Sequence, residues 1–246
     1  MNYKTIIWAL LFIALKPCMA QSGYMEMKMT SDKAGTEGTL KIYYSSVGNR
    51  TEIDTKMGQM PAPMHMIVIS KKSNPNIVTQ VNEAGKTYTE MDVTKNKNND
   101  KTTYTVKKVG DETVNGYKCV HVILTNSRGE VEDLWSSKDV ADYEMYHEAN
   151  KNNPRSGSSE NQLKALKEVG AEGFPVRIIT KRQEAKITMD LVKVEKKAIP
   201  ASMFDVPADY KKQEAMSGFK TSEEMQKMSP EERAKYFENL KNQYGK

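Results

Sequence analysis

The chain has 246 residues, of which 38% are hydrophobic and 8% aromatic, with 37 Lys and Arg against 32 Asp and Glu. Its charges alternate in sign along the sequence, whereas a nucleic-acid-binding protein would concentrate basic residues on one face. The length suffices for one domain with a sizeable core. The low aliphatic and aromatic content favours a sheet that keeps one face in contact with water.

The first twenty residues have the composition of a secretion signal. Lys4 forms a short positive region, Ile6–Leu15 is an unbroken apolar run, and Ala20 ends a stretch of small residues that a signal peptidase recognises. The run is too short to span a bilayer and no second run follows, so we expect no transmembrane anchor. We predict a signal peptide over residues 1–20, cleavage after Ala20, and a periplasmic or secreted product.

A lipoprotein box is the alternative at this position, since it would contain Leu15 and Cys18. Lys16 and Pro17 fit such a box poorly because it requires small uncharged residues there, so ordinary cleavage is the favoured prediction. The cleaved chain would lose two lysines and no acid, which leaves a net charge of +3 and Cys119 as its single cysteine. Such a cysteine is expected to be a buried small hydrophobe or, alternatively, an exposed thiol that pairs between chains.

From residue 23 onwards, apolar and polar residues alternate with a period of two, as in β-strands with one buried face. In the first strand Met25, Met27 and Met29 share one face. Turn residues such as Asn115-Gly116 separate the strands, so the pattern predicts a long up-and-down antiparallel sheet. The expected strands are 23–29, 40–44, 50–57, 64–70, 77–81, 87–93, 103–109, 119–124, 130–135, 176–180 and 186–196.

Helices are expected outside these strands, two of them with clear end signals. One begins near residue 159 and ends at Gly170, where a residue without a side chain suits the end of a helix. The other begins at Ser229–Glu232, which combines an N-cap Ser, Pro at the first helical position and Glu at the third. Its apolar residues recur at three- and four-residue spacing, so it is expected to be amphipathic.

The stretch 203–210 has no regular period. It is expected to be an extended segment that packs Phe204 and Val206 on the sheet. We therefore predict a curved β domain over residues 21–211 and a C-terminal amphipathic helical tail over 212–246.

Four motifs spread over about Tyr24 to Lys211 form a set. They are Tyr24–Met29, Gly116–Cys119 followed by Trp135, Gly173–Pro175, and Phe204–Pro207 followed by Tyr210. The set resembles that of a family of secreted bacterial domains of unknown function (DUF4412-like), whose fold is similar to the periplasmic lipoprotein carriers (LolA/LolB-like). The resemblance implies a mainly β chain with some α structure (α+β). Its curved antiparallel sheet would be an incomplete barrel of about ten strands, with short helices on the concave, apolar side.

The resemblance also suggests a role for one arginine. The carriers use an Arg on an early strand to hold their closed state, and Arg50 is its counterpart here. The carriers begin with a long N-terminal helix that this chain lacks, so the resemblance does not extend to lipoprotein delivery.

Catalytic signatures are absent from the sequence. His65, His121 and His147 lie in no HExxH motif or comparable context, and the chain has neither a phosphate-binding loop nor paired cysteines for zinc. We therefore expect a protein that is not an enzyme and that needs no cofactor.

The leading hypothesis is a non-catalytic monomer that binds a lipid-like or acylated ligand on the concave side of the sheet. One alternative is a copper-binding module, since thioethers with an imidazole can hold Cu(I), although methionine also fills irregular apolar gaps. Another is a structural or interaction protein of the cell envelope. The candidate ligand-binding residues are Met25, Met27, Met29, Arg50, Trp135, Phe204, Phe237 and Leu240. The candidate metal ligands are Met57, Met60, Met64, His65 and Met66.

Overall fold

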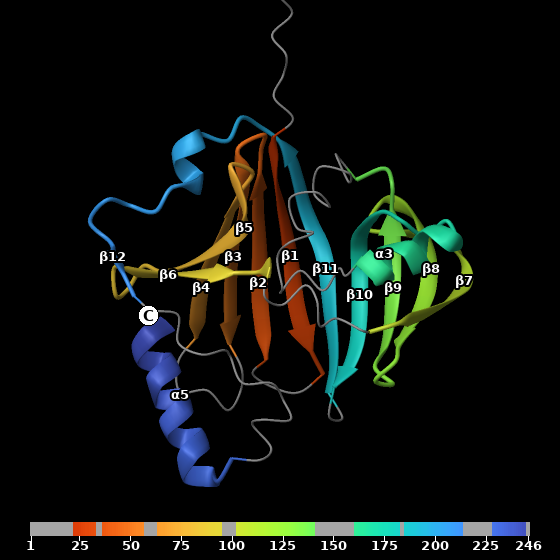
Figure 1. The fold of residues 1–246 in the computed structure, drawn as a ribbon. Coiled ribbons are helices and arrows are strands. Elements are labelled where there is room, and N and C mark those ends of the chain that lie inside the picture. The colour runs from red at the N-terminus through yellow and green to blue at the C-terminus, as the bar shows by residue number, and fades with distance from the viewer. Residues whose placement is uncertain are drawn as a thin grey trace, which may run out of the picture.

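The structure, a computed structural model, describes residues 22–32, 36–56, 63–94, 102–140, 160–182, 185–213 and 228–244 (Figure 1). The predicted signal peptide lies outside these residues, as do Met57 and Met60 of the predicted metal site and the side chain of Leu240. Within the described part of the chain, no helix is both long enough and apolar enough to cross a membrane.

Twelve strands form one open, curved sheet in the order β12-β6-β5-β4-β3-β2-β1-β11-β10-β9-β8-β7. Neighbouring strands are antiparallel except for β12, which runs parallel to β6. The predicted fold class is confirmed. The strands are β1 (Gly23–Ser31), β2 (Glu37–Tyr44), β3 (Gly48–Lys56), β4 (Met64–Lys71), β5 (Asn74–Asn82), β6 (Thr87–Asp92), β7 (Tyr104–Val114), β8 (Tyr117–Asn126), β9 (Val131–Ser137), β10 (Phe174–Arg182), β11 (Ala185–Lys196) and β12 (Lys211–Lys212).

The sheet has more strands than the ten or so expected, and β7 is longer than predicted. β12 has only two residues, which is too short to produce a period-two pattern. β7 continues to Val114 instead of ending at Val109, because a β-bulge at Val109 shifts the register with β8 and interrupts the alternation. Val109 itself is half exposed.

The predicted turn and helix signals are confirmed. Asn115 and Gly116 join β7 to β8 with positive φ angles of 51° and 85°, as a tight hairpin turn requires. Helix α3 (Glu160–Glu168) is followed by Gly170 at φ 70°, and the N–H of Ala171 donates to the carbonyl of Leu166 at 2.9 Å.

The two faces of the sheet carry different elements. On one face, Leu166 of α3 belongs to a buried cluster with Val122 of β8 and Leu134 of β9. Residues that are paired across neighbouring strands point to the same face of the sheet. The strand pairs therefore allow this face to be traced from β8 to β4, across eight strands. We call it the helix face and the opposite one the strap face. One row of the helix face runs Val122, Leu134, Ile178, Met189, Met29, Gly38, Thr55, Met64.

Residues 199–213, here called the strap, lie against the strap face at β4–β6. A 3₁₀ turn, η1 (Ala201–Phe204), places the Phe204 ring in a fully buried position. Val206 packs against the same cluster, so the predicted packing of Phe204 and Val206 on the sheet is confirmed. The sheet residues of that cluster are Ile67, Ile69 and Val81.

Ion pairs and backbone bonds hold the strap at both ends. The N–H of Lys211 donates to the carbonyl of Lys86 at 2.9 Å, next to the β12–β6 pairing. The ion pairs join Lys71 to Asp205 at 2.5 Å, Lys86 to Asp209 at 2.8 Å, and Lys212 to Glu90.

Helix α5 (Pro230–Tyr244) begins with the predicted capping box. The N–H of Glu232 donates to Ser229 Oγ at 3.2 Å, and the N–H of Ser229 donates to Glu232 Oε2 at 2.7 Å. The helix contacts β4, and its Phe237 side chain is half-buried.

Candidate functional site

The helix face of β1–β6 is lined by apolar and uncharged polar side chains. In the described residues of these six strands, no Asp, Glu, Lys or Arg occupies a position on this face. Each methionine of β1 begins a row that crosses the neighbouring strands. The Met25 row continues through Ile42, Thr51, Val68 and Gln80 to Thr89. The Met27 row continues through Leu40 and Ile53 to Met66, and the Met29 row through Gly38 and Thr55 to Met64.

The methionines of this face are shielded from water. Met25 is 0%, Met27 2% and Met66 5% exposed, while Met29 is half-buried. Methionine is unbranched and polarisable, so a surface built from it adapts to apolar partners of different shape. The structure therefore brings together the three predicted methionines of β1 and adds Met66, which the sequence had suggested only as a metal ligand.

Several buried polar side chains interrupt this apolar surface, among them Gln80, Thr55, Thr51 and Thr89. Gln80 is 4% and Thr55 9% exposed. Among the described residues, neither Nε2 of Gln80 nor Oγ1 of Thr55 has a hydrogen-bond partner. Sequence reasoning missed both, because polar residues in a strand normally indicate the face in contact with water.

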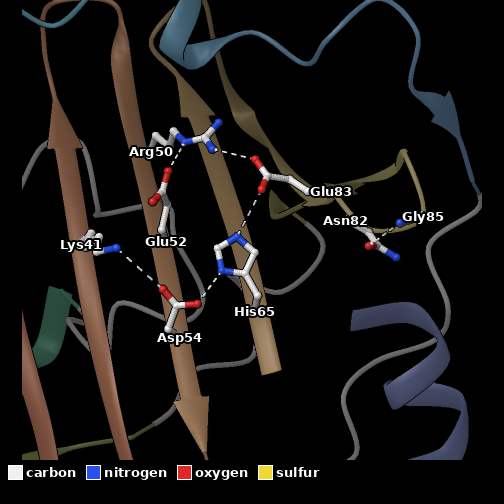
Figure 2. Close-up of polar contacts among 8 residues, drawn as sticks. All are labelled: Lys41, Arg50, Glu52, Asp54, His65, Asn82, Glu83 and Gly85. Atoms are coloured by element: carbon white, nitrogen blue, oxygen red, sulfur yellow. Dashed lines mark hydrogen bonds and ion pairs between the residues drawn. The ribbon is translucent and has the colours of Figure 1, made fainter. Parts of the chain in front are cut away.

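Arg50 and His65 lie on the strap face, in a network of charged groups (Figure 2). Nε of Arg50 donates to Glu52 Oε1 at 2.8 Å, and a second guanidinium nitrogen lies 3.4 Å from Glu83 Oε1. Nδ1 of His65 lies 2.7 Å from Asp54 Oδ1, and Nε2 lies 3.6 Å from Glu83 Oε2. Glu83 thus links β3 and β4 to the turn between β5 and β6.

This network shows how Arg50 and His65 are placed relative to the methionines of the sheet. The Arg50 side chain is only 13% exposed and is paired with two carboxylates, so it fixes strands and does not face the methionine rows. His65 is separated from Met64 and Met66, because consecutive residues of a strand project to opposite faces. The described residues therefore offer no combined Met–His site on β4.

Trp135 belongs to the buried cluster that also contains Met25, Met27 and Leu191. Its ring stacks on that of His121 at a centroid distance of 3.9 Å and an interplanar angle of 13°. The indole N–H donates to Glu112 Oε2 at 3.0 Å, and the two nitrogens of His121 lie 3.0 Å from Glu112 Oε1 and 3.2 Å from Asp133 Oδ1. The sequence alone did not indicate that Glu112 and Asp133 contact His121. The three residues lie on β7, β9 and β8, and only the pairing of these strands brings them together.

Replacing Trp135 by Phe is expected to raise the pKa of Glu112. Hydrogen bonds from the indole of Trp135 and from His121 hold this pKa below its usual value. A lowered carboxyl pKa stabilises the fold above the unfolded-state pKa, and this contribution disappears as the pH falls through the folded-state pKa. The variant should therefore lose less stability on acidification. NMR titration of the Glu112 carboxyl carbon measures the shift, and Glu172, which pairs with Lys138, serves as an unaffected control.

The remaining candidates are dispersed. Phe204 lies beneath the strap on the strap face, and Phe237 lies on α5. Of the predicted ligand-binding residues, Trp135 thus shares a buried cluster with Met25 and Met27, whereas Arg50 and Phe204 lie on the strap face. Cys119 is 3% exposed, its thiol donates to the carbonyl of Tyr117 at 3.4 Å, and burial raises its pKa. It is thus a buried neutral thiol.

A comparison with protein families gives one match. The model of a domain of unknown function, DUF4412, matches residues 22–210, which contain every strand of the sheet except β12. The chain belongs to the DUF4412 family. The family resemblance inferred from the sequence motifs is thus confirmed. No curated protein matches the chain.

Several solved structures are similar to this DUF4412 protein. An uncharacterised conserved protein from Thermus thermophilus is 8% identical with a TM-score of 0.47, and the match covers 79% of this chain and 91% of that one. The lipoprotein LppX from Mycobacterium tuberculosis is 8% identical with a TM-score of 0.35, covering 74% and 90%. MucB, in the MucA/MucB complex of Pseudomonas aeruginosa, is 10% identical with a TM-score of 0.36, covering 78% and 58%.

One motif of the DUF4412 domain has a clear steric reason here. A Cβ added to Gly173 would lie between 2.7 and 3.0 Å from backbone atoms of Ser137, so only glycine allows β9 and the start of β10 to approach this closely. The next residue, Phe174, is fully buried. The Gly173–Pro175 motif therefore fixes the return of the chain into the sheet.

Proposed function

We propose that this DUF4412 protein is a non-catalytic, exported protein that binds an apolar, lipid-like ligand on the helix face of β1–β6. The observation that carries the proposal is the continuous uncharged surface of the Met25, Met27 and Met29 rows. A soluble domain needs only one buried face per sheet, but here the strap face is itself mostly charged and locally covered by the strap. The helix face is the uncharged face of these strands, and its methionines already lie in apolar, water-excluded surroundings, as a lipid-like ligand requires.

Methionine supports this choice of ligand over a purely structural core. Leu, Ile and Val specify a single packing, whereas flexible thioethers accept partners of varied shape. Met25, Met27 and Met29 begin adjacent rows and Met66 lies in the Met27 row, so an acyl chain along β1 would touch the first three and one across the strands would touch Met27 and Met66. A ligand held there would be kept out of contact with water.

Binding of N-phenyl-1-naphthylamine, whose fluorescence rises in apolar surroundings, tests the proposal. We expect saturable binding by the wild-type protein and displacement of the probe by a monoacyl lipid. Met29→Lys should weaken probe binding by about tenfold or more, because it places a charge in the apolar rows and removes a contact surface.

The matched control is Val192→Lys on β11, where the side chain is 53% exposed and a lysine remains in water. This variant should bind the probe like the wild type. Failure of the folded wild-type protein to bind the probe saturably would contradict the proposal and favour an interaction role in the cell envelope.

A further inference from the structure

Gln80 occupies an unusual place for an amide. It lies in the middle of β5, paired with Val68 of β4 and Thr89 of β6, and it follows Val78 on the same face. Val68 and Val78 belong to a buried apolar cluster with Met66. The amide is 4% exposed, and its Nε2 has no hydrogen-bond partner among the described residues.

A buried polar group left without a partner costs about 1–3 kcal/mol. A valine or leucine at position 80 would avoid that cost and would continue the apolar row. The amide N–H groups therefore need an acceptor that the described protein does not supply. Carbonyl, ether, hydroxyl and carboxylate oxygens are the acceptors that a lipid can offer.

The charge pattern selects among these acceptors. A carboxylate or phosphate would bring a buried negative charge, which costs several kcal/mol unless a cation pairs with it. The helix-facing positions of the described β1–β6 hold no cation. The basic residues of these strands that form ion pairs, such as Lys41 and Arg50, project to the strap face instead. An uncharged oxygen is therefore the acceptor that fits.

We propose that Gln80 donates a hydrogen bond to the ester carbonyl of a neutral acyl lipid, so that the protein selects uncharged acyl esters over free fatty acids. Thr55 lies on the same face of β3 and provides a second group, a hydroxyl that can bond to an alcohol oxygen of the ligand. This inference rests on the proposed function, since it names the class of ligand for the same surface.

Two lipids with the same twelve-carbon chain test the selectivity of the wild-type protein. Monolaurin is uncharged, and laurate is an anion at pH 8. In displacement of N-phenyl-1-naphthylamine, monolaurin should bind at least about tenfold more tightly, a ratio that corresponds to about 1.4 kcal/mol. Equal affinities, or tighter binding of laurate, would overturn the inference.

The Gln80→Leu variant separates a ligand-binding role from a packing role. Removing an unpartnered buried amide should raise the melting temperature and lower the affinity for monolaurin by about tenfold, with a much smaller change for the probe, which has no carbonyl group. The control Thr79→Val changes the neighbouring residue on the strap face and should alter neither affinity. A lower melting temperature with unchanged monolaurin affinity would show that Gln80 serves packing, and would overturn the inference.

The two levels of proposal fail in different ways. If neither the probe nor monolaurin binds the folded wild-type protein, the proposed function itself is wrong. If the probe binds but monolaurin and laurate compete equally, the apolar site stands and only the assignment of Gln80 to an ester carbonyl is wrong.

Discussion

Replacing Phe204 by Ala is expected to lower the free energy of unfolding by about 3–5 kcal/mol. The ring is fully buried against Ile67, Ile69 and Val81, and it is the deepest anchor of the strap on the sheet. Its loss removes the apolar contact and leaves a cavity that the short η1 turn cannot fill. Urea denaturation followed by circular dichroism gives the change directly.

The ion pairs of the strap provide the control. Asp209→Asn removes the contact with Lys86, but both side chains are largely exposed, so stability should stay close to that of the wild type. A Phe204→Ala variant as stable as Asp209→Asn would show that the strap is held by its charges and not by the buried ring.

Replacing Gly48 by Ala is expected to destabilise the protein by about 1–3 kcal/mol or more. A Cβ at this position would lie 2.2 Å from the carbonyl oxygen of Ser70 and 3.1 Å from the Cα of Lys71, both backbone atoms of β4. Backbone cannot move aside as a flexible side chain can, so β3 and β4 would have to separate. Thermal denaturation measures the loss.

Gly110→Ala is the matched substitution on β7. No atom lies within 4 Å of a Cβ added there, and its φ angle is not positive. Alanine restricts the unfolded chain more than glycine, so this variant should gain about 0.4–1 kcal/mol. If Gly48→Ala lowers stability and Gly110→Ala raises it, the loss at Gly48 comes from the forced separation of β3 and β4 and not from the glycine-to-alanine change itself. Equal effects would show that the close approach at Gly48 does not limit stability.

Much of the fold follows from local patterns. A period of two placed eleven of the twelve strands, and positive-φ residues such as Gly116 marked the hairpin turns. The capping box at Ser229 began a helix where expected. These signals are local, because each depends on the conformation of a few consecutive residues, and they need no knowledge of which strands are neighbours.

The candidate site could be predicted only where it lies within one strand. The shared face of Met25, Met27 and Met29 follows from alternation alone. Arg50 and Phe204 are on the opposite face, whereas Trp135 joins the buried cluster of Met25 and Met27, and this depends on the register of several strand pairs and on the bulges within them. Along a regular strand, odd and even residue numbers point to opposite faces. Each bulge inserts one residue and so reverses this assignment, and the faces found for β1 cannot be extended to β9 by counting residues.

The open sheet has consequences for how copies of this protein meet. β7 ends the sheet on one side, and an uninterrupted strand there would offer its N–H and C=O groups to the edge of a second molecule. The bulge at Val109 breaks that ladder, and Lys107, Lys108 and Asp111 place charges along it. At the other side β12 has only two residues. Neither edge strand, β7 or β12, therefore offers a long regular ladder to which a second molecule could add a strand. This favours a protein that stays dispersed at high concentration and does not grow into fibres.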